Sequence, residues 1–251
     1  MPLGFLKVFL RHFRVWKRYW FASLVGNVGE PVLYIFAFGY GLGRFMPKIG
    51  ELSYLEFVAP GLALSACLYT SAYECTFSTY TRLARQGTFD AILYTPVLAW
   101  ELALGEIFWG AFKGLLAAGC MLGVFFVIGL VPSLESLVLQ LSVNFLFGLF
   151  IASLSFLTSM MAKSYDFFSY FFSLAVAPLF LFSGVFFPAD AFGDGFRRVV
   201  FLSPLFQAIE VARFAMGQRL AFPVAAFLLF LSVCGISVFV AIYIAKKRLS
   251  H

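Results

Sequence analysis

Long apolar segments recur along the whole chain and alternate with short polar ones. Six of them approach the roughly 20 apolar residues that a helix needs to cross a bilayer. They lie at about residues 21–43, 57–80, 104–130, 136–160, 167–187 and 222–245. Because no polar block between them is large enough to fold separately, we predict an all-α integral membrane protein with six transmembrane helices. Residues 1–251 then form a single transmembrane domain.

The segment before the first span, residues 5–20, has a different pattern. Its basic residues share one face of a helix, and the opposite face carries Phe5, Phe9, Phe13, Trp16 and Trp20. We interpret this segment as an N-terminal amphipathic interfacial helix that lies flat on the membrane. The residues assigned to the membrane surface are Lys7, Arg11, Arg14, Trp16 and Arg18. A solvated helix that packs on a partner is the alternative, although five aligned aromatic residues would make a poor solvent face.

The charge distribution gives an orientation. Six spans place both ends of the chain on the same side of the membrane. Basic residues cluster before the first span and again at Lys246, Lys247 and Arg248, so the positive-inside rule makes both termini cytoplasmic. Residues 188–221 then lie outside. The basic residues there, which conflict with this assignment, are Arg197, Arg198, Arg213 and Arg219.

We interpret residues 188–221 as an external re-entrant region. A serine cap and a first-turn proline at Ser203 and Pro204 would restart a helix, which divides the region into two short amphipathic helices. Helices that leave and re-enter the outer face must be shielded from lipid by protein. The sequence therefore predicts a re-entrant helical hairpin before the last span, with a simple surface loop as the alternative.

Composition agrees with a membrane protein. Hydrophobic residues make up 62% of the chain and charged residues 12%, and the mean hydropathy is +0.94, whereas soluble domains carry about 25% charged residues. The net charge of +6 comes largely from the two ends, which fits an anionic lipid surface and not nucleic acid. The four cysteines lie in apolar segments without a CxxC spacing, so neither a disulfide framework nor a metal site is indicated.

The sequence lacks the residues of common catalytic sites. Its two histidines, His12 and His251, lie at opposite ends of the chain, so we predict no metal cluster and no histidine-based catalysis. No GxxxxGKS/T phosphate loop occurs, so no cofactor is expected in this chain, and any ATP must bind to another polypeptide. The chain is therefore not predicted to be an enzyme.

Charged residues inside the spans are candidates for a translocation path. Glu30, Glu74 and Lys113 lie in predicted spans, where a lone charge is costly and should face the protein interior. They either line a path or form interhelical ion pairs and hydrogen bonds, and both interpretations stay open. Rings with hydroxyl groups, which can stack on sugars but also serve as packing or anchors, complete the candidate path: Tyr34, Tyr69 and Tyr73.

Several motifs resemble the permeases of type-2 ABC exporters. Residues 82–106, RLARQGTFDAILYTPVLAWELALGE, look like that family's coupling segment, in which a basic, glycine-containing turn leads a short helix to the ATPase. Residues 182–188, FSGVFFP, and 202–213, LSPLFQAIEVAR, resemble the signature of its last third, which includes outer re-entrant helices. Residues 26–43, GNVGEPVLYIFAFGYGLG, are similar to the nodulation-factor export permeases within the family. The resemblance covers nearly the whole chain.

The resemblance implies a homodimer of this chain with two copies of an ATP-binding cassette subunit, which hold ATP and Mg. It implies export of a lipo-oligosaccharide or lipid-linked glycan across the bacterial inner (cytoplasmic) membrane. Residues 82–103 would be the cytoplasmic coupling region, with Phe89 as its apolar anchor. The contacts implied with the ATPase subunit are Arg82, Arg85, Gln86, Gly87, Thr88, Phe89, Asp90, Ile92 and Leu93.

Two other functions are compatible with a chain of this kind. One is a membrane-embedded glycosyl or acyl transferase, but the scarcity of histidine and of clustered acids argues against it. The other is an ATP-independent channel or carrier, which would work without an ATPase partner. The lack of a clear internal repeat counts against secondary carriers, because many of them are built from duplicated halves.

Overall fold

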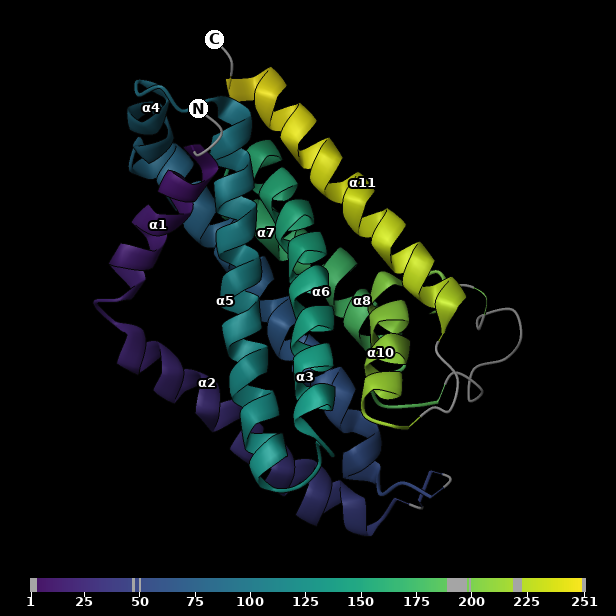
Figure 1. Ribbon diagram of the computed structural model, residues 1–251. Helices are drawn as coiled ribbons and strands as arrows, with labels where there is room; N and C mark the ends of the chain where they lie inside the picture. The colour runs from purple at the N-terminus through teal and green to yellow at the C-terminus, as the bar shows by residue number, and fades with distance from the viewer. Residues whose placement is uncertain are drawn as a thin grey trace.

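The computed structural model describes residues 4–46, 48–49, 51–188, 198, 200–218 and 223–249. These residues are almost entirely helical (Figure 1). The first half contains α1 (Gly4–Trp16), α2 (Trp20–Tyr34), η1 (Ile35–Gly41), η2 (Leu42–Arg44), α3 (Tyr54–Tyr73), η3 (Glu74–Ser78), η4 (Thr81–Arg85), α4 (Thr88–Leu93) and α5 (Ala99–Val127). The second half contains α6 (Leu134–Met161), α7 (Asp166–Phe171), η5 (Phe172–Val176), α8 (Ala177–Leu181), α10 (Pro204–Ala215) and α11 (Val224–Leu249).

Within the described residues, five helical segments are long and apolar enough to span a membrane: Trp20–Arg44, Tyr54–Arg85, Ala99–Val127, Leu134–Met161 and Val224–Leu249. They confirm the all-α membrane architecture. The span expected at residues 167–187 is instead a shorter apolar helix, Asp166–Leu181. At 1.5 Å per residue this helix falls short of the hydrocarbon core of about 30 Å. The count of six crossings therefore stays a prediction.

Two core clusters mark the two ends of the bundle. At one end, Phe89 of α4 packs with residues of α5, α6 and α11, among them Met160 and Ala245. At the other end, Tyr54 of α3 lies in one cluster with Phe125 of α5. Figure 1 shows α1, α4 and the C-terminal end of α11 together, and we call this the α4 end. Because α6 also finishes there, the chain between α6 and α11 has to run back across the bundle.

α3 is the central helix. In the membrane-spanning segment that begins with it, Tyr54–Arg85, 78% of the most apolar 18-residue stretch is buried. It begins with a capping box: the Ser53 hydroxyl accepts the Glu56 N–H at 3.4 Å, and the Glu56 carboxylate accepts the Ser53 N–H at 2.7 Å. α5 approaches α3 and η3 closely at Gly110 and Gly114, where a Cβ would collide with side chains such as Ser71. Small residues of this kind let membrane helices pack with their backbones close together.

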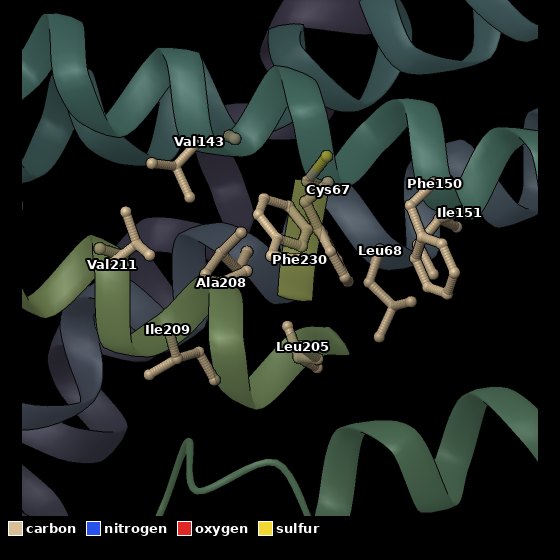
Figure 2. Close-up of a cluster of buried hydrophobic side chains, with 14 of the residues drawn as sticks. Cys67, Leu68, Val143, Phe150, Ile151, Leu205, Ala208, Ile209, Val211 and Phe230 are labelled. Carbon is tan, nitrogen blue, oxygen red and sulfur yellow. The ribbon is translucent and has the colours of Figure 1, made fainter. Parts of the chain in front are cut away.

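α10 lies against α3, α6 and α11. Its apolar residues share a core cluster with Leu68 of α3, Ile151 of α6 and Phe230 of α11 (Figure 2). The helix begins at Pro204, and the Ser203 hydroxyl accepts a backbone N–H of its first turn at 3.4 Å. The predicted restart of a helix at this serine and proline is confirmed.

Arg213 shows how this region accommodates a basic residue. Its guanidinium donates to Glu210 Oε1 at 3.2 Å and to the Gly184 carbonyl at 2.8 Å, and it lies 4.1 Å from the centroid of the Phe57 ring. These contacts compensate the charge inside the protein and join α10 to α3 and to the turn after α8. Residues 189–197, 199 and 219–222 lie outside the described residues, so the complete re-entrant hairpin stays a prediction.

α1 packs against the first part of α5. Val8, His12 and Trp16 belong to a buried stripe along it, and the Phe9 ring lies 5.5 Å from the Phe112 ring of α5. Four residues of the aromatic face that we expected to enter the membrane thus pack on α5, whereas the fifth, Trp20, is 48% exposed. Trp16, which we assigned to the membrane surface, is buried because α1 lies along α5 and not free on the bilayer.

α2 packs poorly on the rest of the chain. In the segment Trp20–Arg44, 6% of the most apolar 18-residue stretch is buried. The side chains of Phe21, Leu33 and Phe36 are exposed. Figure 1 shows that the elbow between α1 and α2 stands away from α5 and that α2 then runs back toward the far end of α5. An apolar surface of this extent is not left in water, so α2 must meet lipid or another protein.

Candidate functional site

Charged side chains from η3, η4 and α5 meet near the α4 end. Arg82 donates to Glu106 Oε2 at 2.7 Å and to Glu74 Oε1 at 3.1 Å, and the Thr79 hydroxyl donates to Glu106 Oε2 at 3.0 Å. The Glu106 side chain is fully buried, and those of Arg82 and Glu74 are 12% and 14% exposed. We call these residues, together with His12 and Trp109, the charge network.

His12 and Trp109 extend the charge network to α1. His12 Nε2 lies 2.8 Å from Glu106 Oε1, and the His12 ring stacks on the Trp109 ring at a centroid distance of 5.5 Å. The Trp109 indole N–H donates to Glu74 Oε1 at 3.1 Å. No role was predicted for His12, because the two histidines lie at opposite ends of the chain. Its place on the same helical stripe as Val8 and Trp16 was the available signal that it faces inward.

The three charged residues proposed for a translocation path have different surroundings. Glu74 is ion-paired in the charge network, and Lys113 Nζ donates to Ser23 Oγ of α2 at 3.3 Å. For these two residues the interhelical contacts that we left open are present. Glu30 is exposed on α2 and does not face the interior as expected, because α2 barely packs on the rest of the chain.

The tyrosine candidates also differ in their surroundings. Tyr34 is partly buried beside Phe38, and Tyr69 packs edge-on against Phe180 at 5.6 Å. Tyr73 is 51% exposed and stacks on Phe172 at 4.5 Å. Tyr73 is therefore the candidate whose ring is both held by a neighbour and accessible.

A row of three hollows follows the segment from α3 to α4, and α1 lines the first two of them. Its first hollow, of about 620 Å³, lies between α1 and α4. Its second, of about 360 Å³, is lined by the charge network and Tyr19. Its third, of about 530 Å³, lies along Thr70 and Tyr73. Arg11 lines the first two hollows and Glu74 the last two, so neighbouring hollows share a lining residue. We call the three together the α1–α3 crevice.

The α1–α3 crevice combines aromatic rings with hydrogen-bonding groups. Tyr73 and Phe77 present rings, while Ser78, Thr81 and the Glu74 carboxylate supply polar atoms. Such a mixture suits a ligand with a polar, ring-shaped head and an apolar remainder. Glu74 is ion-paired and also lines two of the hollows, and its role in a translocation path stays a prediction.

α4 is held on the bundle by its apolar residues. Gly87, with φ of 58°, precedes the helix in a conformation that favours glycine. Phe89 is fully buried and packs on the α5–α6–α11 cluster, with Ile92 and Leu93 against the same cluster. Phe89, expected to anchor the ATPase, therefore anchors α4 itself. Arg82 points into the charge network and not outward.

The outward face of the coupling region consists of other residues. Arg85, Gln86 and Asp90 are exposed there, and Tyr94 is 91% exposed one helical turn after Asp90. Sequence reasoning missed Tyr94. The available signal was its spacing of four residues from Asp90, which places both on one side of a helix.

Comparison with known proteins identifies the class. The ABC-2 type transporter family matches residues 4–217. The chain belongs to this family, and it is a multi-pass membrane permease, a transport subunit and not an enzyme.

Individual relatives refine this assignment. The chain is 33% identical to nodulation protein J of Neorhizobium galegae over 99% of its own length and 95% of the relative's. It is 32% identical to nodulation protein J of Rhizobium meliloti strain 1021, over 84% and 80% of the two chains. Its identity to the inner membrane transport permease YadH of Escherichia coli K12 is 25%, over 78% and 76%. No solved structure matches the chain. The resemblance to nodulation-factor export permeases is confirmed.

Proposed function

We propose that this chain is the permease half of an ATP-driven exporter that moves a lipo-oligosaccharide or lipid-linked glycan across the bacterial inner membrane. It acts as a homodimer with two ATP-binding cassette subunits, which bind ATP and Mg. The α4 end and both termini face the cytoplasm. The relatives named nodulation protein J and inner membrane transport permease support this proposal.

The α1–α3 crevice is the observation that supports the proposed class of substrate. Tyr73 offers an accessible ring, and Glu74 offers a carboxylate beside it. The sugar head of the substrate occupies this part of the crevice, and its lipid tail stays on the apolar side that α2 leaves open. The exposed face of α2 meets the second copy of the permease, which closes the crevice toward lipid.

Movement reaches the crevice through the charge network. The ATPase docks on the outward face of the coupling region, with Arg85, Asp90 and Tyr94 as contacts. A displacement of α4 is passed to η4, which precedes it, and from Arg82 to Glu106 and to His12 of α1. α1 continues through the elbow into α2. Closure of the ATPase therefore moves α2 and changes the width of the crevice on the side that α2 leaves open.

Substrate-stimulated ATP hydrolysis tests the proposal. The permease is copurified with its ATP-binding cassette partner and titrated with a lipidated oligosaccharide. Tyr73→Ala should raise the half-maximal concentration roughly two- to tenfold, because aromatic contacts are worth about 0.5–1.5 kcal/mol. Tyr243→Ala, which removes an exposed tyrosine of α11, is the matched control. Equal effects of the two variants, or transport without any ATPase, would contradict the proposal.

A further inference from the structure

The first hollow of the α1–α3 crevice has a basic side on α1 and a mixed side on α4. Lys7 and Arg11 line it from α1. The lining from α4 and its flanking segments combines apolar residues with neutral polar ones: Ala91, Ile92, Val97, Gln86, Thr88 and Thr95. A volume of about 620 Å³ lies within the range of cavities that hold small ligands. The hollow is thus shaped for a group that carries charge on the α1 side.

The two basic side chains lack partners among the described residues. Lys7 and Arg11 are one helical turn apart, and neither side chain forms an ion pair or hydrogen bond within the described ranges. Glu101, the carboxylate in this lining, already accepts the Gly4 N–H and the Leu98 N–H, each at 3.0 Å. The hollow therefore has two cations against one engaged carboxylate, which favours an anion.

Apolar side chains lie next to these cations on α1. Leu6 and Leu10, four residues apart on one side of the helix, are each 39% exposed. In a membrane permease such side chains are covered by acyl chains. An anion with an acyl chain suits both the basic and the apolar residues, because its charge reaches Lys7 and Arg11 while its chain covers Leu6 and Leu10.

We propose that the hollow between α1 and α4 binds the phosphate of an anionic phospholipid through Lys7 and Arg11. Its acyl chains cover Leu6 and Leu10, which lie on one side of α1. The lipid bridges α1 to α4, the two elements that move together in coupling. This is a defined site and not the general attraction of a basic helix to the membrane. The site does not depend on which substrate the permease exports.

A pair of charge-matched variants separates a site from general attraction. Lys7→Gln/Arg11→Gln removes one lysine and one arginine that line the hollow. Arg14→Gln/Lys17→Gln removes the same charges from exposed positions nearby that do not line it. The full chain is purified in neutral detergent, and thermal unfolding is followed as phosphatidylglycerol or phosphatidylcholine is added.

Phosphatidylglycerol should raise the Tm of the wild type and of Arg14→Gln/Lys17→Gln, and phosphatidylcholine should not. For Lys7→Gln/Arg11→Gln the phosphatidylglycerol midpoint should be at least about tenfold higher, because two charge-assisted contacts are lost. Ala91→Phe fills the hollow from α4 without changing charge and should weaken the effect similarly. It also provides the test if Lys7→Gln/Arg11→Gln does not fold.

Three results would overturn the site. Equal loss in both charge-matched variants would leave only general attraction. A Tm increase reproduced by inorganic phosphate alone would show that the hollow takes a free anion and not a lipid. Loss of ATPase capture in Lys7→Gln/Arg11→Gln with an unchanged phosphatidylglycerol effect would assign the two cations to a protein partner.

Discussion

Replacing Arg82 by alanine removes the cation at the centre of the charge network. Arg82 contacts Glu106 at 2.7 Å and Glu74 at 3.1 Å, and the fully buried Glu106 would keep only His12 and Thr79 as polar partners in the described chain. Removing one member of a buried ion pair costs about 3–5 kcal/mol. At roughly 2–4 °C per kcal/mol for a chain of this size, the Tm should fall by roughly 6–20 °C.

The assay is thermal unfolding of the purified permease without its ATPase. Arg85→Ala serves as control, because Arg85 is exposed and has a ring contact with Tyr165 at 5.9 Å, worth about 1 kcal/mol or less. A loss with Arg82→Ala no larger than with Arg85→Ala would refute a closed network. If Arg82→Ala instead left the Tm unchanged and weakened ATPase capture, Arg82 would be the partner contact that the family resemblance implies.

The remaining predictions concern the coupling region and the topology. Tyr94→Ala should weaken ATPase capture by about tenfold or more, as exposed aromatic anchors do at interfaces, and should leave the Tm of the permease unchanged. Phe89→Ala should do the reverse and lower the free energy of unfolding by about 3–5 kcal/mol, because it empties a fully buried site. Cysteines placed at Lys48 and Tyr94 should react with an impermeant reagent from opposite sides of the membrane. Reaction of both from one side would contradict the orientation.

Hydropathy predicted most of the helical segments because membrane spans are defined by length and apolarity alone. The first span was expected at residues 21–43 and lies at Trp20–Arg44. The span predicted at residues 167–187 is longer than the helix found there, Asp166–Leu181. It is apolar to its end, but the helix stops at Leu181 and a turn follows with Gly184 at φ of 77°. Hydropathy does not register such a turn, since the residues in it remain apolar.

The candidate site was harder to predict because its contacts are distant in sequence. Glu74 stood out as a charge inside a span, but its partners Arg82 and Trp109 come from η4 and α5. Helical periodicity shows which residues share a face but not which neighbour that face meets. For this reason Phe89 and Trp16 were assigned to outward contacts although both are buried.

A network of buried charges is not needed for stability at this position. Proteins in which well-packed apolar residues replace a buried ion pair are often as stable as the original or more stable. The charges therefore favour a different interpretation, in which they hold α1, η4 and α5 in one defined arrangement. We therefore expect Arg82→Met/Glu106→Leu to lower the free energy of unfolding by less than Arg82→Ala does, because no buried charge is left at position 106 and the partly exposed Glu74 keeps its hydrogen bond from Trp109. The same variant should assemble with the ATPase yet lose substrate stimulation of hydrolysis, because α4 is no longer connected to α1. Normal stimulation in a stable, assembled variant would show that movement reaches the crevice by another route.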